Sequence, residues 1–292
     1  MAQPMATSLQ HKRDAAASPA LGENALARLL LRARPLVMGV LNVTPDSFSD
    51  GGRFLDPAAA LAQAHRLVAE GADILDVGAE STRPYGGPVA VPRDEERARL
   101  APVLSEAVKL GIPVSIDTLK ADVAAWALGQ GAAIVNDVWG LQRDPDMAPV
   151  VAERGAPVII MHNREQADPA VDIVADVTAF FARSLEIAAR AGIDRARIVL
   201  DPGIGFGKTP EQSITCIARL AAWRGFGLPL LVGASRKRFI HSLVPSTPDE
   251  RLGGSLAAHL IAVEHGATIV RVHDVAPTVQ AFAVAAAIRR AK

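Results

Sequence analysis

Short polar or glycine-bearing motifs recur along this chain, and each follows an apolar run that could form a β-strand. In chain order the motifs begin at Asn42, Asp76, Asp117, Asn136, Met161, Asp201, Gly233 and Arg271. They supply carboxylates, amides, imidazole and cations, which bind polar ligands through hydrogen bonds and charge. The sequence therefore places one candidate functional motif at the end of each of eight predicted strands.

Four of the polar side chains form a candidate site for a flat heterocycle: Asp117, Asn136, Asp201 and Lys237. A carboxylate can accept two parallel N–H groups, an asparagine offers a donor and an acceptor, and a lysine donates to a carbonyl or ring nitrogen. This set matches a ring with a guanidine-like edge and a keto oxygen, such as a pterin or a guanine. The alternative is that Asp117 and Asp201 each cap the helix after their strand.

A second set of side chains suits an anion. Arg271 and His273 lie two positions apart on a predicted strand, so they face the same side, and both can donate hydrogen bonds. Barrels often bind phosphate near their last two strands. The amide oxygen of Asn42 is a suitable ligand for Mg²⁺, which needs few side chains when substrate phosphates and waters complete its shell. For His273 the alternative is a buried histidine with a structural role.

Three loops have compositions that bear on function. Residues 43–56 and 78–92 are long and rich in glycine and proline, as is typical of lids and binding loops. Residues 201–208 contain Gly203, Gly205 and Gly207. These glycines could form a phosphate cradle, although the spacing is not that of a Walker loop, or a tight turn that requires positive φ angles.

The elements that must position these groups alternate strictly between strand and helix. Neighbouring motifs lie about 33 residues apart on average, the length of a strand, a helix and their loops. We predict strands at 35–41, 73–77, 113–116, 132–135, 157–161, 197–200, 228–232 and 268–272. We predict helices at 57–70, 93–110, 120–128, 145–153, 172–191, 210–223, 236–243, 249–265 and 277–290. Eight units favour a closed barrel, which collects the C-terminal ends of all strands on one rim.

The fold class is therefore predicted to be α/β, a single (β/α)8 TIM barrel over residues 35–292 with a short N-terminal extension over residues 1–34. Within the extension we expect a helix from Asn24 to Arg34 that covers the bottom of the barrel with Leu26, Leu29 and Leu30. The length of 292 residues fits one barrel of about 250 residues plus this extension.

Composition excludes several classes of partner. Lys plus Arg and Asp plus Glu both number 31, so no net field attracts nucleic acid or an anionic membrane. No apolar run reaches the roughly 18 residues of a membrane span. The single cysteine, Cys216, allows no intrachain disulfide and fits a reducing compartment. We expect a cytoplasmic enzyme that acts on small molecules.

Seven strings in the chain closely resemble those of the dihydropteroate synthases, in family order and at similar spacing over residues 36–290: NVTPDSFSDGG, ESTRP, SIDT, NDV, DPGIGFGK, GASRKRF and RVHDV. The resemblance implies a transferase of folate biosynthesis, and a sulfonamide target. It would join 6-hydroxymethyl-7,8-dihydropterin pyrophosphate to 4-aminobenzoate, giving 7,8-dihydropteroate and pyrophosphate. It further implies Mg²⁺ as cofactor and a homodimer.

The resemblance also implies a role for individual residues. Pterin binding would fall to Asp117, Asn136, Met161, Asp201, Phe206 and Lys237. Pyrophosphate binding would fall to Arg271, His273 and, through Mg²⁺, Asn42. The aminobenzoate site would comprise Thr82, Arg83, Pro84, Phe206 and Ser235. The catalytic residues would be Asp117, Lys237, Arg271 and His273.

The chain departs from the family pattern after Met161-His162, where Asn163-Arg164-Glu165 replaces a frequent Met-Gln-Gly. Two other functions fit the same pterin-edge residues. A methyltransferase domain that uses methyltetrahydrofolate and a corrinoid protein would not need the pyrophosphate residues or the two long loops. A non-catalytic pterin-binding paralogue would be expected to have lost loop residues, and none is recognisably lost here.

Overall fold

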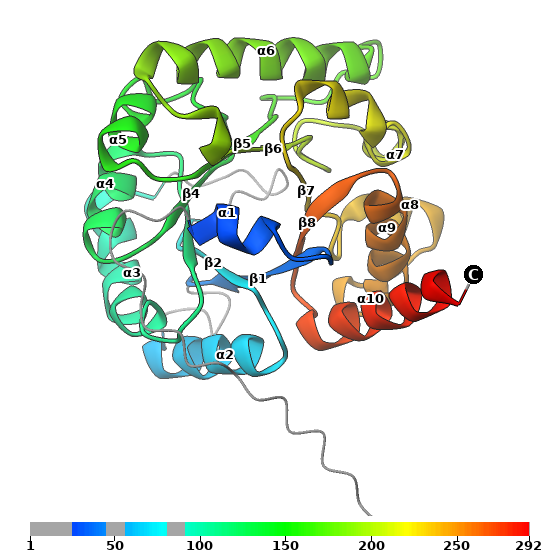
Figure 1. Cartoon of the computed structure of the whole chain (residues 1–292), viewed down its shortest axis with the longest axis horizontal. Helices are drawn as coiled ribbons and strands as arrows, with labels where there is room; N and C mark the ends of the chain where they lie inside the picture. Colours follow the sequence, from blue (N-terminus) through cyan, green and yellow to red (C-terminus); the bar gives the residue numbers. More distant parts are fainter. Residues whose placement is uncertain (1–24, 45–55, 81–90, 292) are drawn as a thin grey trace, which may run out of the picture.

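The computed structural model of the chain describes residues 25–44, 56–80 and 91–291. Eight parallel strands form a closed barrel in sequence order, which confirms the predicted fold (Figure 1). The strands are β1 (Leu36–Asn42), β2 (Ile74–Gly78), β3 (Val114–Asp117), β4 (Ile134–Asp137), β5 (Val158–Met161), β6 (Ile198–Asp201), β7 (Leu230–Val232) and β8 (Ala267–Val272). Most strands end one or two residues later than predicted, so Asn42, Asp117 and Asp201 are the last residues of their strands.

Helices surround the strands on the outside of the barrel (Figure 1). They are α2 (Pro57–Ala69), α3 (Arg93–Ala107), α4 (Ala121–Gly129), α5 (Met147–Arg154), α6 (Ile173–Ala191), α7 (Pro210–Ala218), α8 (Arg238–Leu243), α9 (Leu252–Glu264) and α10 (Val275–Arg290). Their inner faces and the outward-facing strand residues form the main core. Within the described residues, none of the helices is long and apolar enough to cross a membrane.

Most predicted helices have slightly different boundaries in the structure, and three of these differences have a clear physical reason. The helix predicted at 210–223 is two elements, because α7 ends at Ala218 and a 3₁₀-helix follows at Leu220–Phe226. The helix predicted at 249–265 starts as a 3₁₀ turn, Pro248–Arg251, before α9. The last helix starts two residues before Pro277. Proline is tolerated there because amide groups in the first turn have no partner inside the helix.

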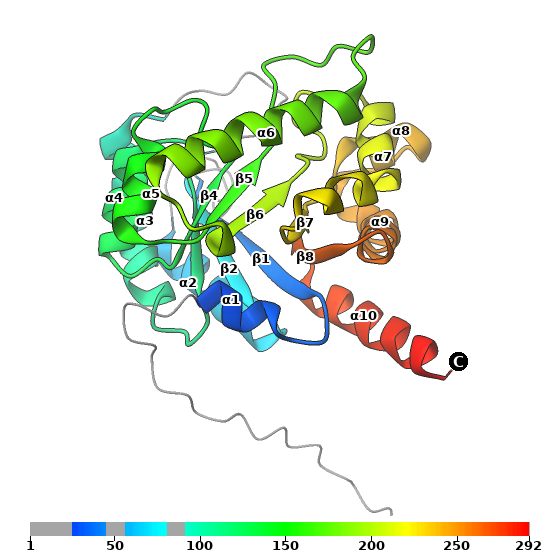
Figure 2. The same ribbon diagram turned by 45° about the horizontal axis from the view of Figure 1, so that its top comes forward.

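The N-terminal helix α1 (Ala25–Leu30) closes one end of the barrel, as Figures 1 and 2 show. It is shorter than the predicted 24–34 helix. Pro35 follows Arg34, and the proline ring disfavours the helical conformation of the residue before it. Its Leu26 and Leu29 pack into the inner apolar cluster of the barrel. That cluster contains one or two inward-facing residues from most of the strands: Leu36, Met38, Ile74, Ile134, Ile159, Val199, Leu231 and Ile269.

Candidate active site

The next inward-facing position on each strand lies two residues beyond this apolar layer, because side chains alternate along a strand. On β1 that position is Val40, and on the other seven strands the positions are occupied by Asp76, Asp117, Asn136, Met161, Asp201, Gly233 and Arg271. A cavity at this level is lined by Asp117, Asn136, Val138, Met161, Asp201, Ile204, Phe206, Gly233, Lys237 and Arg271. All six residues predicted to bind the heterocycle therefore line one cavity, together with Arg271.

Arg271 lies in the wall of this cavity between two carboxylates. Its Nε donates to Asp76 Oδ2 at 2.5 Å, and its Nη2 donates to Asp117 Oδ2 at 2.8 Å. Asp76 Oδ2 also accepts from the side-chain nitrogen of Asn136 at 3.1 Å. The guanidinium predicted to bind an anion thus also connects two predicted heterocycle residues, since it binds Asp117 directly and Asn136 through Asp76.

Burial changes the proton affinity of both predicted acceptor carboxylates. It raises the pKa of Asp117 to about 7, against the opposing effect of Arg271. It raises the pKa of Asp201 to about 6, against a hydrogen bond from the Gly203 amide and the charge of Lys237. Asp117 Oδ1 is buried and has no hydrogen-bond partner among the described residues. Such an acceptor is costly in an empty site and is satisfied when a ligand donates to it.

Neither carboxylate caps the helix that follows it, so that alternative is wrong. Helix α4 has no side-chain cap, whereas Thr209 caps α7 through a capping box. Asp201 instead accepts from the Gly203 amide at 2.7 Å, within the loop after β6. Both side chains keep acceptor capacity that could serve a ligand.

The apolar wall of the cavity is made by Val138, Met161 and Phe206. Lys237 extends over the Phe206 ring, with its Nζ 4.1 Å from the ring centroid. Burial, reinforced by the charge of Arg271, lowers the pKa of Lys237 to about 7. A flat ligand in this cavity would meet an apolar surface on one side and polar groups at its edge, which is the arrangement typical of small-molecule sites.

The other two predicted anion residues, Asn42 and His273, lie at the rim. Asn42 ends β1 and is half-buried, and His273 follows β8. Ser235 Oγ lies 3.0 Å from His273 Nδ1, so the structure brings a predicted aminobenzoate residue against a predicted pyrophosphate residue. Burial, with Arg271 nearby, lowers the pKa of His273 to about 3, so the ring is neutral at pH 7 and would contact an anion through an N–H group.

The remaining polar residues named near the rim fall into two groups. Thr82, Arg83 and Pro84 lie outside the described residues, as do most of the two long loops. The guanidinium of Arg236, which follows Ser235, is paired with Asp274 and Asp249 at 2.6 Å each.

The glycine loop after β6 is a tight turn, as one of the two interpretations of its sequence required. Gly203, Gly205 and Gly207 have φ angles of 67°, 80° and 53°, in the region that favours glycine. A Cβ at Gly203 would lie 2.0 Å from the carbonyl oxygen of His162, so this loop packs directly on the segment after β5.

Asp76 is a polar residue of the site for which the sequence motifs predicted no role. It is fully buried, binds Arg271 and Asn136 through one oxygen, and has no partner for Oδ1 among the described residues. The signal was present in the sequence, because Asp76 lies two residues beyond Ile74 and therefore on the inner face of the barrel.

Comparison with known proteins first defines the class. A family model described as "Pterin binding enzyme" matches residues 38–273. Dihydropteroate synthase of Bacillus subtilis is 45% identical over 248 residues, covering 85% of this chain and 86% of that protein. The enzyme of Mycobacterium leprae is 45% identical over 264 residues, covering 86% and 92%.

Solved structures agree. A Clostridium difficile dihydropteroate synthase in the presence of pteroic acid is 46% identical with a TM-score of 0.83, covering 88% of this chain and 97% of that one. A Xanthomonas albilineans dihydropteroate synthase with 4-aminobenzoic acid is 45% identical with a TM-score of 0.84, covering 88% and 94%. The chain belongs to the dihydropteroate synthase family of pterin-binding enzymes, which are transferases.

Proposed function

We propose that this enzyme joins 6-hydroxymethyl-7,8-dihydropterin pyrophosphate to 4-aminobenzoate, forming 7,8-dihydropteroate and releasing pyrophosphate. The main support is the buried cavity, in which Asp117 has a carboxylate oxygen with no partner among the described residues, beside Asn136, Asp201 and Lys237. Those groups complement the N–H and carbonyl edge of a pterin. Related structures that contain pteroic acid or 4-aminobenzoic acid point to the same pair of substrates.

Hydrogen-bond polarity supports a defined pterin orientation. Asn136 donates its amide nitrogen to Asp76, which can only accept when ionised, so its oxygen is left to accept from the ligand. Asp117 and Asp201 would accept from the guanidine-like edge of the pterin. Lys237 would donate to the carbonyl or a ring nitrogen.

The reaction needs little acid–base chemistry from the protein. The C–O bond to the diphosphate breaks, the C–N bond to the aniline nitrogen forms, and that nitrogen releases a proton to water or to the released diphosphate. The pterin can delocalise positive charge at its methylene carbon, so we propose that the leaving group departs first. Arg271 and His273 would bind the diphosphate, and the closed cavity would exclude water from the cation.

Magnesium is part of this proposal. Among the described residues there is no cluster of three or more His, Cys, Asp or Glu side chains that could hold a metal ion. The half-buried amide of Asn42 fits an ion held mainly by phosphate oxygens and waters. When bound, Mg²⁺ would neutralise charge on the diphosphate.

A homodimer in the cytoplasm is proposed as the working form. Helices α8, α9 and α10 lie at one side of the barrel (Figure 2), and each of the three exposes large apolar side chains. They are Leu243 and Val244 at the end of α8, Ile261 on α9, and Val284 and Ile288 on α10. Exposed apolar side chains on adjacent helices are typical of surfaces that a second chain covers. Size-exclusion chromatography with light scattering should give twice the mass of one chain, and a monomer would contradict the proposal.

One assay tests the reaction. Purified protein is incubated with the pterin pyrophosphate, Mg²⁺ and labelled 4-aminobenzoate, and labelled 7,8-dihydropteroate is expected. Omission of Mg²⁺ with added chelator should abolish product. Pterin binding without product would support a non-catalytic paralogue, and methyl transfer from methyltetrahydrofolate to a corrinoid protein would support the methyltransferase alternative.

A further inference from the structure

A buried lysine lies behind the wall of the cavity and is not among the residues that line it. Lys208 follows the glycine loop and is only 4% exposed. Its Nζ donates to the carbonyl oxygen of Phe206 at 3.0 Å and contacts Nδ1 of His162 at 2.7 Å. A buried ammonium group is costly, so its presence here needs a reason beyond filling space.

The chemistry of lysine determines how the neighbouring histidine is protonated. An ammonium group can only donate, so Nδ1 of His162 accepts and the ring carries its proton on Nε2. Nε2 then donates to Asp176 Oδ2 on α6 at 2.9 Å. Burial and the charge of Lys208 lower the pKa of His162 to about 3, consistent with a neutral ring. One hydrogen-bonded chain thus runs from α6 to the backbone of Phe206.

This series of hydrogen bonds holds the backbone of the segment that carries Phe206. The glycine loop presents few side chains that could hold it, and its closest packing is to the backbone of residues 162–164. The hydrogen bond from Lys208 to the Phe206 carbonyl restrains the backbone of the loop at Phe206, and the Phe206 ring forms part of the cavity wall. Loss of that bond would leave the ring position to weaker packing forces.

Lys208 also places a positive charge close to the cavity carboxylate on β6. Together with Lys237 and Arg271, it lowers the pKa of Asp201 against the effect of burial. The groups that interact electrostatically with Lys208 itself come from several elements: Cys216, Asp201, Asp176 and Arg164, besides the neutral ring of His162. Burial lowers the pKa of Lys208 to about 8, so the ammonium form prevails at neutral pH.

We propose that Lys208 is a positioning residue of the pterin site, which holds Phe206 in place from behind through the Phe206 carbonyl. This inference rests on the proposed function. It separates Lys208 from residues that only stabilise the fold, because one of its two hydrogen-bond partners is the backbone of Phe206, whose ring forms part of the cavity wall. Its loss should therefore appear mainly in pterin binding.

The test compares Lys208→Met, which removes both the donor and the charge, with Lys208→Gln, which keeps a donor and removes the charge. Lys109→Met is the matched control, because Lys109 is an exposed lysine on the outside of the barrel. For each variant, kcat, KM for the pterin pyrophosphate and KM for 4-aminobenzoate are measured from pH 5 to pH 9, together with thermal unfolding.

We expect Lys208→Met to raise KM for the pterin substrate about tenfold, the scale of one charged hydrogen bond, with KM for 4-aminobenzoate changed by less than about twofold. The acid limb of kcat/KM should move to higher pH, because Asp201 loses a cation that favours its ionised form. Lys208→Gln should recover part of the KM change but retain the shift in pH. Lys109→Met should match the wild type.

Two results would overturn the proposal. The first is a Lys208→Met enzyme of lower thermal stability whose KM values and pH profile equal those of the wild type. The second is failure of both Lys208 variants to fold, which would make Lys208 a residue of the fold; if only the methionine variant fails, the pH profile of the glutamine variant decides. An inactive wild-type enzyme would instead refute the proposed function.

Discussion

The two ends of the barrel each hold buried carboxylates beside arginines, but only one end leaves them incompletely paired. At the bottom, Asp73 is 3% exposed and accepts from Arg32, from both outer nitrogens of Arg34 and from the Val37 amide. At the rim, Asp76 and Asp117 each keep one oxygen without a partner among the described residues. The bottom is thus electrostatically complete, whereas the rim retains acceptors for a ligand.

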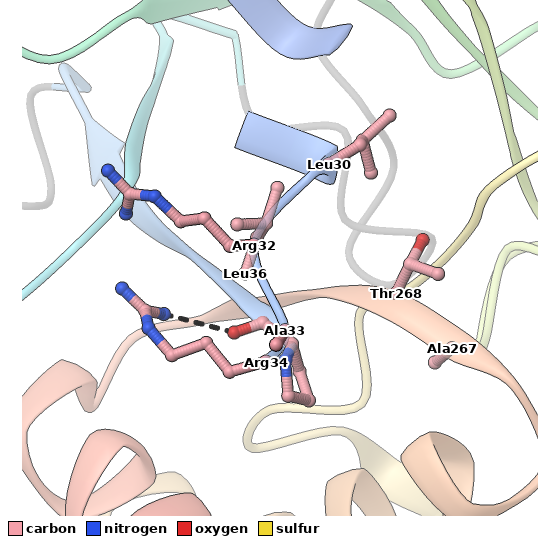
Figure 3. Close-up of a pocket in the computed structure, with 8 residues that line it drawn as sticks. Leu30, Arg32, Ala33, Arg34, Leu36, Ala267 and Thr268 are labelled. Carbon is pink, nitrogen blue, oxygen red and sulfur yellow. Dashed lines mark hydrogen bonds between the residues drawn. The ribbon is translucent and has the colours of Figure 1, made fainter. Parts of the chain in front are cut away.

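Cavity size alone would point to the wrong end. A cavity of about 240 Å³ lies at the bottom, against about 20 Å³ for the cavity at the rim. The bottom cavity is lined by Leu30, Arg32, Ala33, Arg34, Pro35, Leu36, Ala267 and Thr268. Figure 3 shows both arginine side chains extending to one side, away from Thr268. Arg34 donates to the Pro35 carbonyl at 3.1 Å as well as to Asp73. Because its charged groups are already paired, this cavity is a packing space, and unsatisfied polarity is the better indicator of function.

The largest expected effect is at the rim and concerns activity. Asp201→Asn should lower kcat/KM for the pterin substrate roughly 30- to 1000-fold, which corresponds to a loss of about 2–4 kcal/mol in transition-state binding. The reason is that the amide NH₂ group of asparagine would face an N–H donor of the pterin. Stability should hardly change, since the amide oxygen can still accept from the Gly203 amide. Steady-state kinetics and calorimetry with the pterin ligand check this. Unchanged pterin affinity would remove Asp201 from the site.

The converse effect is expected at the bottom. Leu26 is 1% exposed and packs among the inner apolar residues, so Leu26→Ala should lower the free energy of unfolding by about 2 kcal/mol through lost burial. KM values should stay at wild-type values, because α1 lies at the opposite end from the cavity. Leu31→Ala is the control, since Leu31 is 85% exposed and should change neither quantity. A kinetic defect in Leu26→Ala would show that the two ends are coupled.

A third measurement uses pH. The pKa of Asp117 in the folded protein, about 7, lies above its ordinary value of 3.8, so its contribution to stability is full below pH 3.8 and is lost as pH rises through 7. The unfolding free energy of the wild type relative to Asp117→Asn should therefore fall by about 1–2 kcal/mol between pH 5 and pH 8. Urea unfolding at several pH values tests this, and a flat difference would contradict the raised pKa.

The smallest effect is expected from Arg32→Ala. Asp73 would still accept from Arg34 and from the Val37 amide, and Arg32 is about half exposed. The free energy of unfolding should fall by no more than about 0.5–1 kcal/mol, as is usual for an exposed ion pair, and less in high salt. Chemical denaturation at two salt concentrations measures this. A loss well above 1 kcal/mol would mean that the bottom is less completely paired than the structure indicates.

Sequence patterns predicted the fold and most of the cavity because both depend on local periodicity. Regular spacing of strands and helices predicted the barrel, and strand ends predicted Asp117, Asn136 and Asp201. Helix boundaries near 220 and 250 were less predictable, since a 3₁₀ turn and an α-helix share nearly the same apolar spacing.

Pairing between distant residues was the part that the sequence did not reveal. Asp73 and Asp76 are three residues apart, yet one is saturated by arginines at the bottom and the other lies at the site. Which carboxylate meets Arg271 depends on how the barrel closes across nearly the whole chain. The same holds for Lys208, whose partner His162 comes from another strand end.

The two-residue step between the apolar layer and the cavity has a consequence for how such enzymes can diverge. Ile74, Ile134, Val199 and Ile269 keep the barrel closed, while the neighbouring inward positions carry the recognition groups. Mutations at these neighbouring inward positions can therefore alter ligand preference one strand at a time, without removing the apolar residues that drive folding. A lineage could pass from one heterocycle to another through a series of folded intermediates, and a designer could follow the same route.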